Sequence, residues 1–211
     1  MKMKIDYNKP VTREQIDLSA YNAKFKRADD WLRSEDRDLE EYGQLLMDPT
    51  LFGYLHFRID GKPAKLFPYQ DMIINDPYRF KFFRAANQIG KSLLFDFKAC
   101  RNLLWDHGHA HNEAIVSKSL PQSVFQMRRI RSLLNSMPEI DWEEVKGNAD
   151  SMSIISVDIK DNNKPLGKKT KYTNLAICAP CTEGLLGYDL HELNLDEFEF
   201  WEVDIKYFFN H

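Results

Sequence analysis

Three consecutive residues, Gly90, Lys91 and Ser92, have the side chains that proteins use to bind the phosphates of a nucleotide. Such a site needs backbone N–H groups directed at the phosphates, a lysine that reaches the terminal phosphates and a hydroxyl that holds Mg²⁺, all at a helix N-terminus. The full pattern, G-x-x-x-x-G-K-[ST], places its first glycine at position 85, where this chain has Ala85. The alternative is an ordinary helix start with an exposed lysine. We predict a phosphate-binding loop whose nucleotide contacts come from Ala85, Asn87, Gln88, Ile89, Gly90, Lys91 and Ser92.

An acid pair, Asp196 and Glu197, ends the short run "LNLDE". An aspartate at a strand end is suited to hold Mg²⁺, and a neighbouring glutamate is suited to polarise an attacking water. We therefore predict Glu197 as the catalytic base, with Lys91 as the second catalytic residue and Ser92 and Asp196 as the Mg²⁺ ligands. The alternative is a solvated acidic turn, because "DEFEFWE" carries four acids in seven residues.

A third candidate element is "FPYQ", residues 67–70. The amide of Gln70 can pair with the N6 and N7 edge of adenine. The ring of Tyr69 or Phe67 could stack on the base. The alternative is an aromatic turn that precedes a helix at "QDMIIND".

These candidates lie among runs that alternate between strand-like and helical patterns, which predicts an α/β fold with a mainly parallel sheet flanked by helices. Strands are expected at 79–85 and 112–119, with a strand pair at 150–160 and 171–180 and a short strand that ends at Asp196. Helices are expected after Gly90 and from a capping box formed by Ser119 and Gln122. The predicted buried stripes are Leu93, Phe97, Cys100 and Leu104 on the first helix, and Val124, Met127, Ile130, Leu134 and Met137 on the second.

The N-terminal part is charged and reads as helical from about residue 11 to residue 48, so we expect a solvated helical arm. Residues 49–66 contain several prolines and glycines, which favour turns and loops, so we place the domain boundary there. The predicted organisation is a helical N-terminal arm or subdomain at 1–60 and a nucleotide-binding core at 61–211.

The amino-acid composition limits the classes of function that this chain can have. The formal net charge is −3, so any nucleic-acid contact must come from a local patch. Three cysteines do not make a disulfide framework, which favours a reducing compartment. We find no signal-peptide pattern at the N-terminus and no apolar run of membrane-spanning length, so no membrane partner is expected.

Together, "FPYQ", "RAANQIGKS", "IVSKSLPQSVFQMRRIRSLL" and "LNLDE" resemble the N-terminal ATPase domain of the large terminase of tailed bacteriophages, over about residues 66–200. The resemblance implies a P-loop NTPase fold of the ASCE type that hydrolyses ATP with Mg²⁺ to drive double-stranded DNA into a procapsid in the host cytoplasm. It also implies the portal and the small terminase subunit as partners, and a homo-oligomer when active. A monomer is expected for an isolated fragment.

The sequence departs from this family in two places. The family's loop arginine is replaced by Asn87, and the position of its arginine finger falls near Leu186 and Gly187. Arg128, Arg129 and Arg131 are candidates to replace the arginine finger. The alternative is that they lie on a solvated face of their helix. The family's nuclease domain is expected to be absent from this chain, which ends at residue 211. Other functions left open are a helicase-like ATPase, a small-molecule kinase and a nucleotide-binding module that does not hydrolyse.

Two weaker patterns remain. His107, His109 and His111 alternate, and Cys178 and Cys181 are spaced as zinc ligands often are. The alternative is a loop of histidines and two buried thiols. Lysines at 160, 164, 168, 169 and 171 could contact a phosphate backbone or could be solvated.

Overall fold

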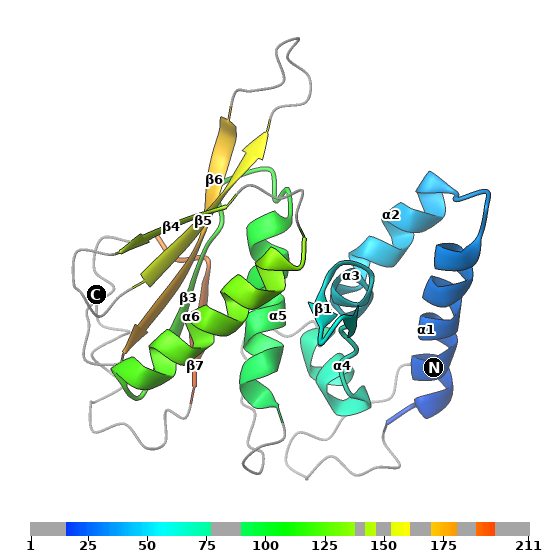
Figure 1. Ribbon diagram of the computed structural model, residues 1–211, viewed down its shortest axis with the longest axis horizontal. Helices are drawn as coiled ribbons and strands as arrows, with labels where there is room; N and C mark the ends of the chain where they lie inside the picture. Colours follow the sequence, from blue (N-terminus) through cyan, green and yellow to red (C-terminus); the bar gives the residue numbers. More distant parts are fainter. Residues whose placement is uncertain are drawn as a thin grey trace. The chain divides into compact units, whose positions relative to one another are not determined.

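The computed structural model describes residues 16–76, 90–137, 142–146, 153–160, 170–180 and 189–196, and divides the chain into two compact units, 1–89 and 90–211. Each unit has its own secondary structure and packing (Figure 1). The predicted domain organisation, with an N-terminal subdomain at 1–60 and a core at 61–211, stays a prediction. Among the helices described, none is long and apolar enough to cross a membrane.

The first unit is mainly helical. Its elements are α1 (Leu18–Arg33), α2 (Leu39–Met47), α3 (Pro49–His56), β1 (Arg58–Ile59), β2 (Lys62–Pro63) and α4 (Pro68–Ile74). An aspartate caps each of the first three helices. The side chains of Asp17, Asp38 and Asp48 accept hydrogen bonds from first-turn N–H groups at 2.8–2.9 Å, which satisfies donors that the helix itself leaves unpaired.

This unit has a hydrophobic core, so the expectation of a solvated arm was wrong. The core consists of Tyr21, Phe25, Ala28, Leu45, Leu51 and Leu55. Residues 21, 25 and 28 follow the four- and three-residue spacing of one helix face, so their side chains pack against α2 and α3. Of the charged residues between them, Lys26 and Arg27 are exposed, whereas Lys24 is partly buried in ion pairs.

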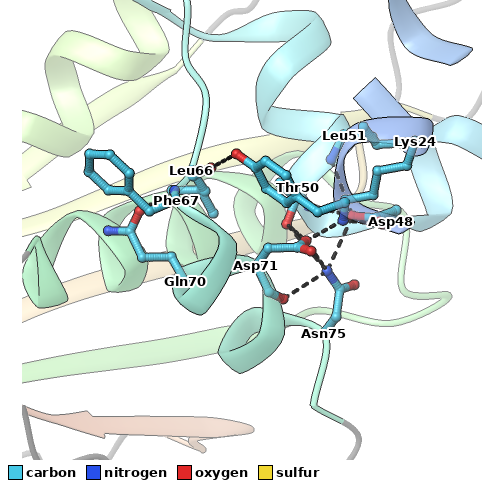
Figure 2. Close-up of polar contacts among 10 residues, drawn as sticks. Lys24, Asp48, Thr50, Leu51, Leu66, Phe67, Gln70, Asp71 and Asn75 are labelled. Atoms are coloured by element: carbon cyan, nitrogen blue, oxygen red, sulfur yellow. Dashed lines mark hydrogen bonds and ion pairs between the residues drawn. The ribbon is translucent and has the colours of Figure 1, made fainter. Parts of the chain in front are cut away.

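A polar cluster joins α1, α3 and α4 of the first unit (Figure 2). Lys24 of α1 forms ion pairs with Asp71 of α4 and with Asp48, the latter at 2.8 Å. Asp71 Oδ1 also accepts hydrogen bonds from Thr50 at 2.6 Å and from Asn75 at 2.9 Å. Several donors thus share one carboxylate, which explains why α4 belongs to this unit although it follows the proline- and glycine-rich segment.

The second unit is an α/β structure, which confirms the α/β part of the predicted fold class, whereas the P-loop NTPase fold stays a prediction. Its elements are α5 (Lys91–Leu104), β3 (Asn112–Ser117), α6 (Leu120–Asn135), β4 (Glu143–Lys146), β5 (Ser153–Lys160), β6 (Thr170–Pro180) and β7 (Glu192–Leu195). The strand order is β4-β5-β6-β3-β7. The strands β6, β3 and β7 are parallel, whereas β5 is antiparallel to both β4 and β6.

Helices α5 and α6 lie over the same face of this sheet (Figure 1). Strand residues alternate between that face and the other one, because successive side chains point to opposite sides. Ala114, Ile177 and Ala179 form an apolar cluster together with Ile154, Leu190 and Leu193. The polar residues that alternate with these in β3 and in 192–196 bond to α5, to α6 or to each other; they are Glu113, Ser117, Glu192, Asn194 and Asp196.

The end of α5 is fixed by a residue of β6. Asn174 is fully buried, and its Nδ2 donates to the backbone carbonyls of Asn102, Leu103 and Trp105 at 3.0–3.1 Å. These carbonyls belong to the last turn, where a helix has no acceptor partners of its own. Because the same Asn174 pairs with Val157 in the β5–β6 ladder, the end of α5 is tied to the sheet.

The predicted helix stripes need correction. On α5 the buried apolar residues include Leu94 and Leu103 rather than Leu93 and Leu104, while Phe97 and Cys100 are buried as predicted. On α6, Met127, Ile130 and Leu134 are buried, but Val124 is exposed and Met137 lies beyond the helix end. The stripe of α6 begins instead with Ser123 and Gln126, two polar residues directed inward.

Candidate nucleotide-binding site

The N-terminus of α5 carries the predicted lysine and serine. Gly90 is its N-cap, with φ 82° and ψ 27°, and Lys91 and Ser92 are the first two helical residues. A left-handed conformation of this kind suits glycine because it has no Cβ to collide with the backbone. The first turn holds no acidic side chain. A helix of 14 residues that begins in this way directs backbone N–H groups and a partial positive charge toward an anion.

Asp196 lies beside this helix start. It directly follows β7, and its N–H donates to Val116 O at 2.9 Å, which extends the parallel β3–β7 ladder by one residue. Its carboxylate Oδ2 accepts a hydrogen bond from Ser92 Oγ at 3.2 Å. Residues that are 104 positions apart in the sequence thus meet at the carboxyl edge of the parallel strands, where ligands bind in α/β sheets.

Gln126 of α6 supports Asp196 and was missed by the sequence analysis. Its Nε2 donates to Asp196 Oδ2 at 3.0 Å, and its Oε1 accepts from Ser117 Oγ at 2.8 Å. Both Gln126 and Ser117 are buried. The signal was a polar side chain four residues before Ile130, within the apolar stripe of an amphipathic helix.

A second pair lies one turn further along α5. Asp96 is fully buried, and its Oδ2 accepts a hydrogen bond from Arg129 Nε of α6 in an ion pair. The pKa of Asp96 is raised to about 7, mainly because burial disfavours the charged form; Arg129 opposes this rise and the carboxylate of Asp196 adds to it. Arg129 is therefore not part of a solvated helix face, whereas Arg128 is exposed.

Gln70 lies in the first unit, at the start of α4 (Figure 2). Its side chain is buried, and its Oε1 accepts a hydrogen bond from the backbone N–H of Phe67 at 2.7 Å. This is the contact that the alternative interpretation, a helix start after an aromatic turn, requires. The ring of Tyr69 stacks on that of Phe67, with centroids 6.0 Å apart. The adenine-binding role of Gln70 and Tyr69 stays a prediction.

Several predicted residues lie outside the described part of the chain. They are the loop residues Ala85, Asn87, Gln88 and Ile89, the catalytic Glu197, and Cys181. The strand predicted at 79–85 and the positions expected for an arginine finger, 186 and 187, also lie there. Of the predicted phosphate and Mg²⁺ site, the structure brings together Gly90, Lys91, Ser92 and Asp196.

The described cysteine of the predicted zinc pair, Cys178, is not near the histidines. It is buried in β6 and pairs with Ile115 of β3, whereas His111 precedes β3 and its carbonyl accepts from the N–H of Leu175. Leu175 and Cys178 are three positions apart in the strand, a distance of roughly 10 Å at 3.3 Å per residue. A site that combines Cys178 with His111 does not fit this register.

No family model and no curated protein matches the chain. Similar solved structures include the large terminase ATPase domain of Thermus phage P74-26, with 19% identity, a TM-score of 0.39, and coverage of 53% of this chain and 45% of that one. A point mutant of the same domain gives 18% identity, a TM-score of 0.41, and coverage of 59% and 52%. This chain therefore spans about half the length of the structures that it matches. TM-scores this low do not establish a common fold, so the function must be argued from the chain's own residues.

Proposed function

We propose that this chain is an ATPase that binds MgATP at the N-terminus of α5, and that it serves as the motor domain of a phage DNA-packaging terminase. The observation that carries the proposal is the contact between Ser92 Oγ and Asp196 Oδ2 at 3.2 Å. It joins a hydroxyl from the helix start to a carboxylate from the end of a parallel strand.

This pair has the chemistry of a magnesium site in P-loop NTPases, where the serine of the loop and an acid at a strand end share the ion. Both donors are hard oxygen atoms, which Mg²⁺ prefers. When bound, Mg²⁺ would neutralise charge on the β- and γ-phosphate oxygens.

The chain's own residues have separate tasks in this proposal. Lys91 extends from the first turn of α5 to the terminal phosphates, where its ammonium charge offsets the charge that develops during transfer. The N–H groups that follow Gly90 bind the phosphate oxygens. Gln126 holds Asp196 in place through its bonds to Asp196 and Ser117.

Glu197 is proposed as the base that orients and polarises the attacking water. It follows Asp196 directly in the sequence. A carboxylate that accepts a proton from water would place the reaction among hydrolyses rather than among transfers to another molecule.

The finer proposal, translocation of double-stranded DNA, is supported by the order and spacing of "FPYQ", "RAANQIGKS", the segment after 112–117 and "LNLDE". In such a motor the subunits act as a ring, so the proposed partners are further copies of this chain, DNA, the portal and the small terminase subunit. An isolated monomer is expected to hydrolyse slowly, because a neighbouring subunit completes the site.

Phosphate release from ATP, measured with Mg²⁺ and with or without linear double-stranded DNA, tests the proposal. We expect hydrolysis that DNA stimulates. Glu197→Gln should lower the rate by about 10²–10⁴-fold while ATP binding is retained. Glu199→Gln is the matched control, since it removes an acid from the same run and should leave the rate unchanged within about twofold.

Other results would assign other functions. ATP binding without turnover at any protein or DNA concentration would indicate a nucleotide-binding module. Phosphate transfer to an added nucleoside, with no stimulation by DNA, would indicate a kinase. A Glu197→Gln variant as active as the original chain would remove Glu197 from the mechanism.

A further inference from the structure

A second polar cluster lies at the amino ends of β3 and β7, on the edge of the parallel strands opposite to Ser117 and Asp196. Glu113 of β3 is adjacent to Glu192 of β7 in the ladder. Both side chains bond to α5, since Asn102 Nδ2 lies 2.7 Å from Glu113 Oε2 and 3.2 Å from Glu192 Oε2. Asn194 donates to the other oxygen of Glu113 at 2.6 Å.

The charges in this cluster do not balance. Among the residues that the structure describes, these two carboxylates are paired with one cation, Lys98, which forms an ion pair with Glu192. Glu113 is almost completely buried. Buried carboxylates are normally paired with cations or coordinate metal ions, so a further positive charge would complete this cluster.

An imidazole lies against the two carboxylates. His111 Nε2 is buried and has no hydrogen-bond partner among the residues that the structure describes. Ligand atoms of His111, Glu113 and Glu192 lie within 4.8 Å of one another. The His111 ring is also stacked between those of His107 and His191, with centroids 4.2 and 5.2 Å away, which restricts its orientation.

We propose that His111, Glu113 and Glu192 form a binding site for a divalent transition-metal ion with the chemistry of Zn²⁺. One imidazole nitrogen and two carboxylate oxygens are ligands that zinc accepts, at metal–ligand distances of about 2.0–2.2 Å. Small side-chain rotations close the observed spacing to these distances. The imidazole favours zinc over Mg²⁺, which is bound by oxygen atoms.

The surroundings fit such a site. Asn102 and Asn194 bond the carboxylates and so orient them, as the neighbours of metal ligands usually do. The site is separate from the nucleotide, since Glu113 and Ser117 are four residues apart in β3, roughly 13 Å. A bound ion would hold the amino ends of β3 and β7 together.

This donor set differs from the zinc site suggested by the sequence, which combined the histidines with Cys178 and Cys181. Only His111 is common to both. X-ray absorption of the bound metal separates them, because sulfur and nitrogen or oxygen ligands give different bond lengths.

Equilibrium dialysis of the full chain against Zn²⁺, in millimolar Mg²⁺ and without nucleotide, tests the proposal. We expect one Zn²⁺ per chain and a coordination sphere of nitrogen and oxygen. His111→Ala and Glu192→Gln should each weaken binding by at least about tenfold. His109→Ala is the matched control, because His109 is an exposed imidazole of the same histidine group that is not among the three proposed ligands.

The proposal is overturned if no saturable zinc binding occurs, if sulfur is found in the coordination sphere, or if His111→Ala and Glu192→Gln bind zinc as tightly as the original chain. Circular dichroism checks the fold of each variant. Should His111→Ala not fold, Glu192→Gln decides the question, since it keeps the size of the side chain and an oxygen that can accept from Asn102.

Discussion

Asp196 is the residue on which the candidate site converges. Its Oδ2 accepts hydrogen bonds from Ser92 and Gln126, which come from two different helices. A carboxylate with two donors is held in one orientation, and this is what a ligand of Mg²⁺ requires. The two helices and β7 therefore meet at one oxygen atom.

Removal of Gln126 tests the role of this support. In Gln126→Ala, Asp196 loses the hydrogen bond from Gln126 Nε2 and the buried Ser117 hydroxyl loses its acceptor. We expect the Mg²⁺ concentration at half-maximal ATPase rate to rise by about tenfold, and the free energy of unfolding to fall by about 1–3 kcal/mol. Magnesium titrations and chemical denaturation measure the two effects.

Gln44→Ala is the control, because Gln44 is an exposed glutamine of the first unit whose Oε1 accepts a hydrogen bond from Arg27. An unchanged Mg²⁺ requirement in Gln126→Ala would show that Asp196 needs no support from α6.

The burial of Asp96 predicts a dependence of stability on pH. The pKa of Asp96 in the folded protein is raised to about 7, above the value of about 3.9 for an unfolded chain. The folded state thus binds this proton more tightly, so its contribution to stability is complete below about pH 4 and is lost as the pH rises to about 7. In Asp96→Asn the free energy of unfolding should fall less between roughly pH 5 and pH 8 than in the original chain. Identical pH profiles of the two proteins would contradict this account of Asp96.

At the residue scale, the sequence could predict the residues proposed to contact nucleotide and Mg²⁺, but not the buried residues that support them. Lys91, Ser92 and Asp196 were identified because their types and neighbours carry the chemistry. Gln126 and Asp96 were not, although Gln126 lies within the apolar stripe of α6, because residue type alone does not show that a glutamine or an aspartate on a helix is directed inward. Their roles follow from the packing of α5 and α6 on the sheet, which is a tertiary property.

At the element scale, the start of α5 determines where the N–H groups point. Gly90 has a φ of 82°, which costs a residue with a Cβ about 1–2 kcal/mol. Gly90→Ala should therefore lower the free energy of unfolding by about 1 kcal/mol and weaken ATP binding. Chemical denaturation followed by circular dichroism and nucleotide titration measure these changes.

Gly43→Ala is the matched control for this prediction. Gly43 lies within α2, and an added Cβ there meets nothing within 4 Å. Alanine is the better helix former, so this variant should gain about 0.5–1 kcal/mol. Equal effects at positions 43 and 90 would exclude backbone strain as the reason for glycine at position 90.

The order of the elements could largely be predicted from the sequence. The strand at 112–117, the capped helix after Ser119 and the antiparallel pair β5–β6 are confirmed. Periodicity failed where polar residues are buried, as at the start of α6, where Ser123 and Gln126 point inward and Val124 is exposed. Buried polar residues also break the apolar pattern of β7, since Glu192 bonds Asn102 of α5 and Asn194 bonds Glu113 of β3.

At the scale of the whole molecule, the net charge of −3 means that any binding of DNA must come from a local basic patch. The lysines between positions 160 and 171 are the candidate patch. Reversing Lys168 and Lys169 to glutamate should weaken DNA binding and reduce the slope of log affinity against log salt concentration by roughly 2, if each contacts one phosphate. Fluorescence anisotropy with labelled duplex DNA at several salt concentrations measures both.

Reversal of Lys26 and Lys62 is the control with the same charge change, because both residues are exposed and lie in the first unit. If both double variants weaken DNA binding equally, net charge rather than the patch governs the interaction.

The most direct test of the central claim is calorimetric titration of the chain with a nonhydrolysable ATP analogue and Mg²⁺. A triphosphate held at the start of α5 predicts one site per chain, and at least about tenfold weaker binding in Lys91→Ala. Lys26→Ala, which removes an exposed lysine, should bind as the original chain does. Equal affinity of Lys91→Ala and the original chain, or no binding by either, would contradict the claim.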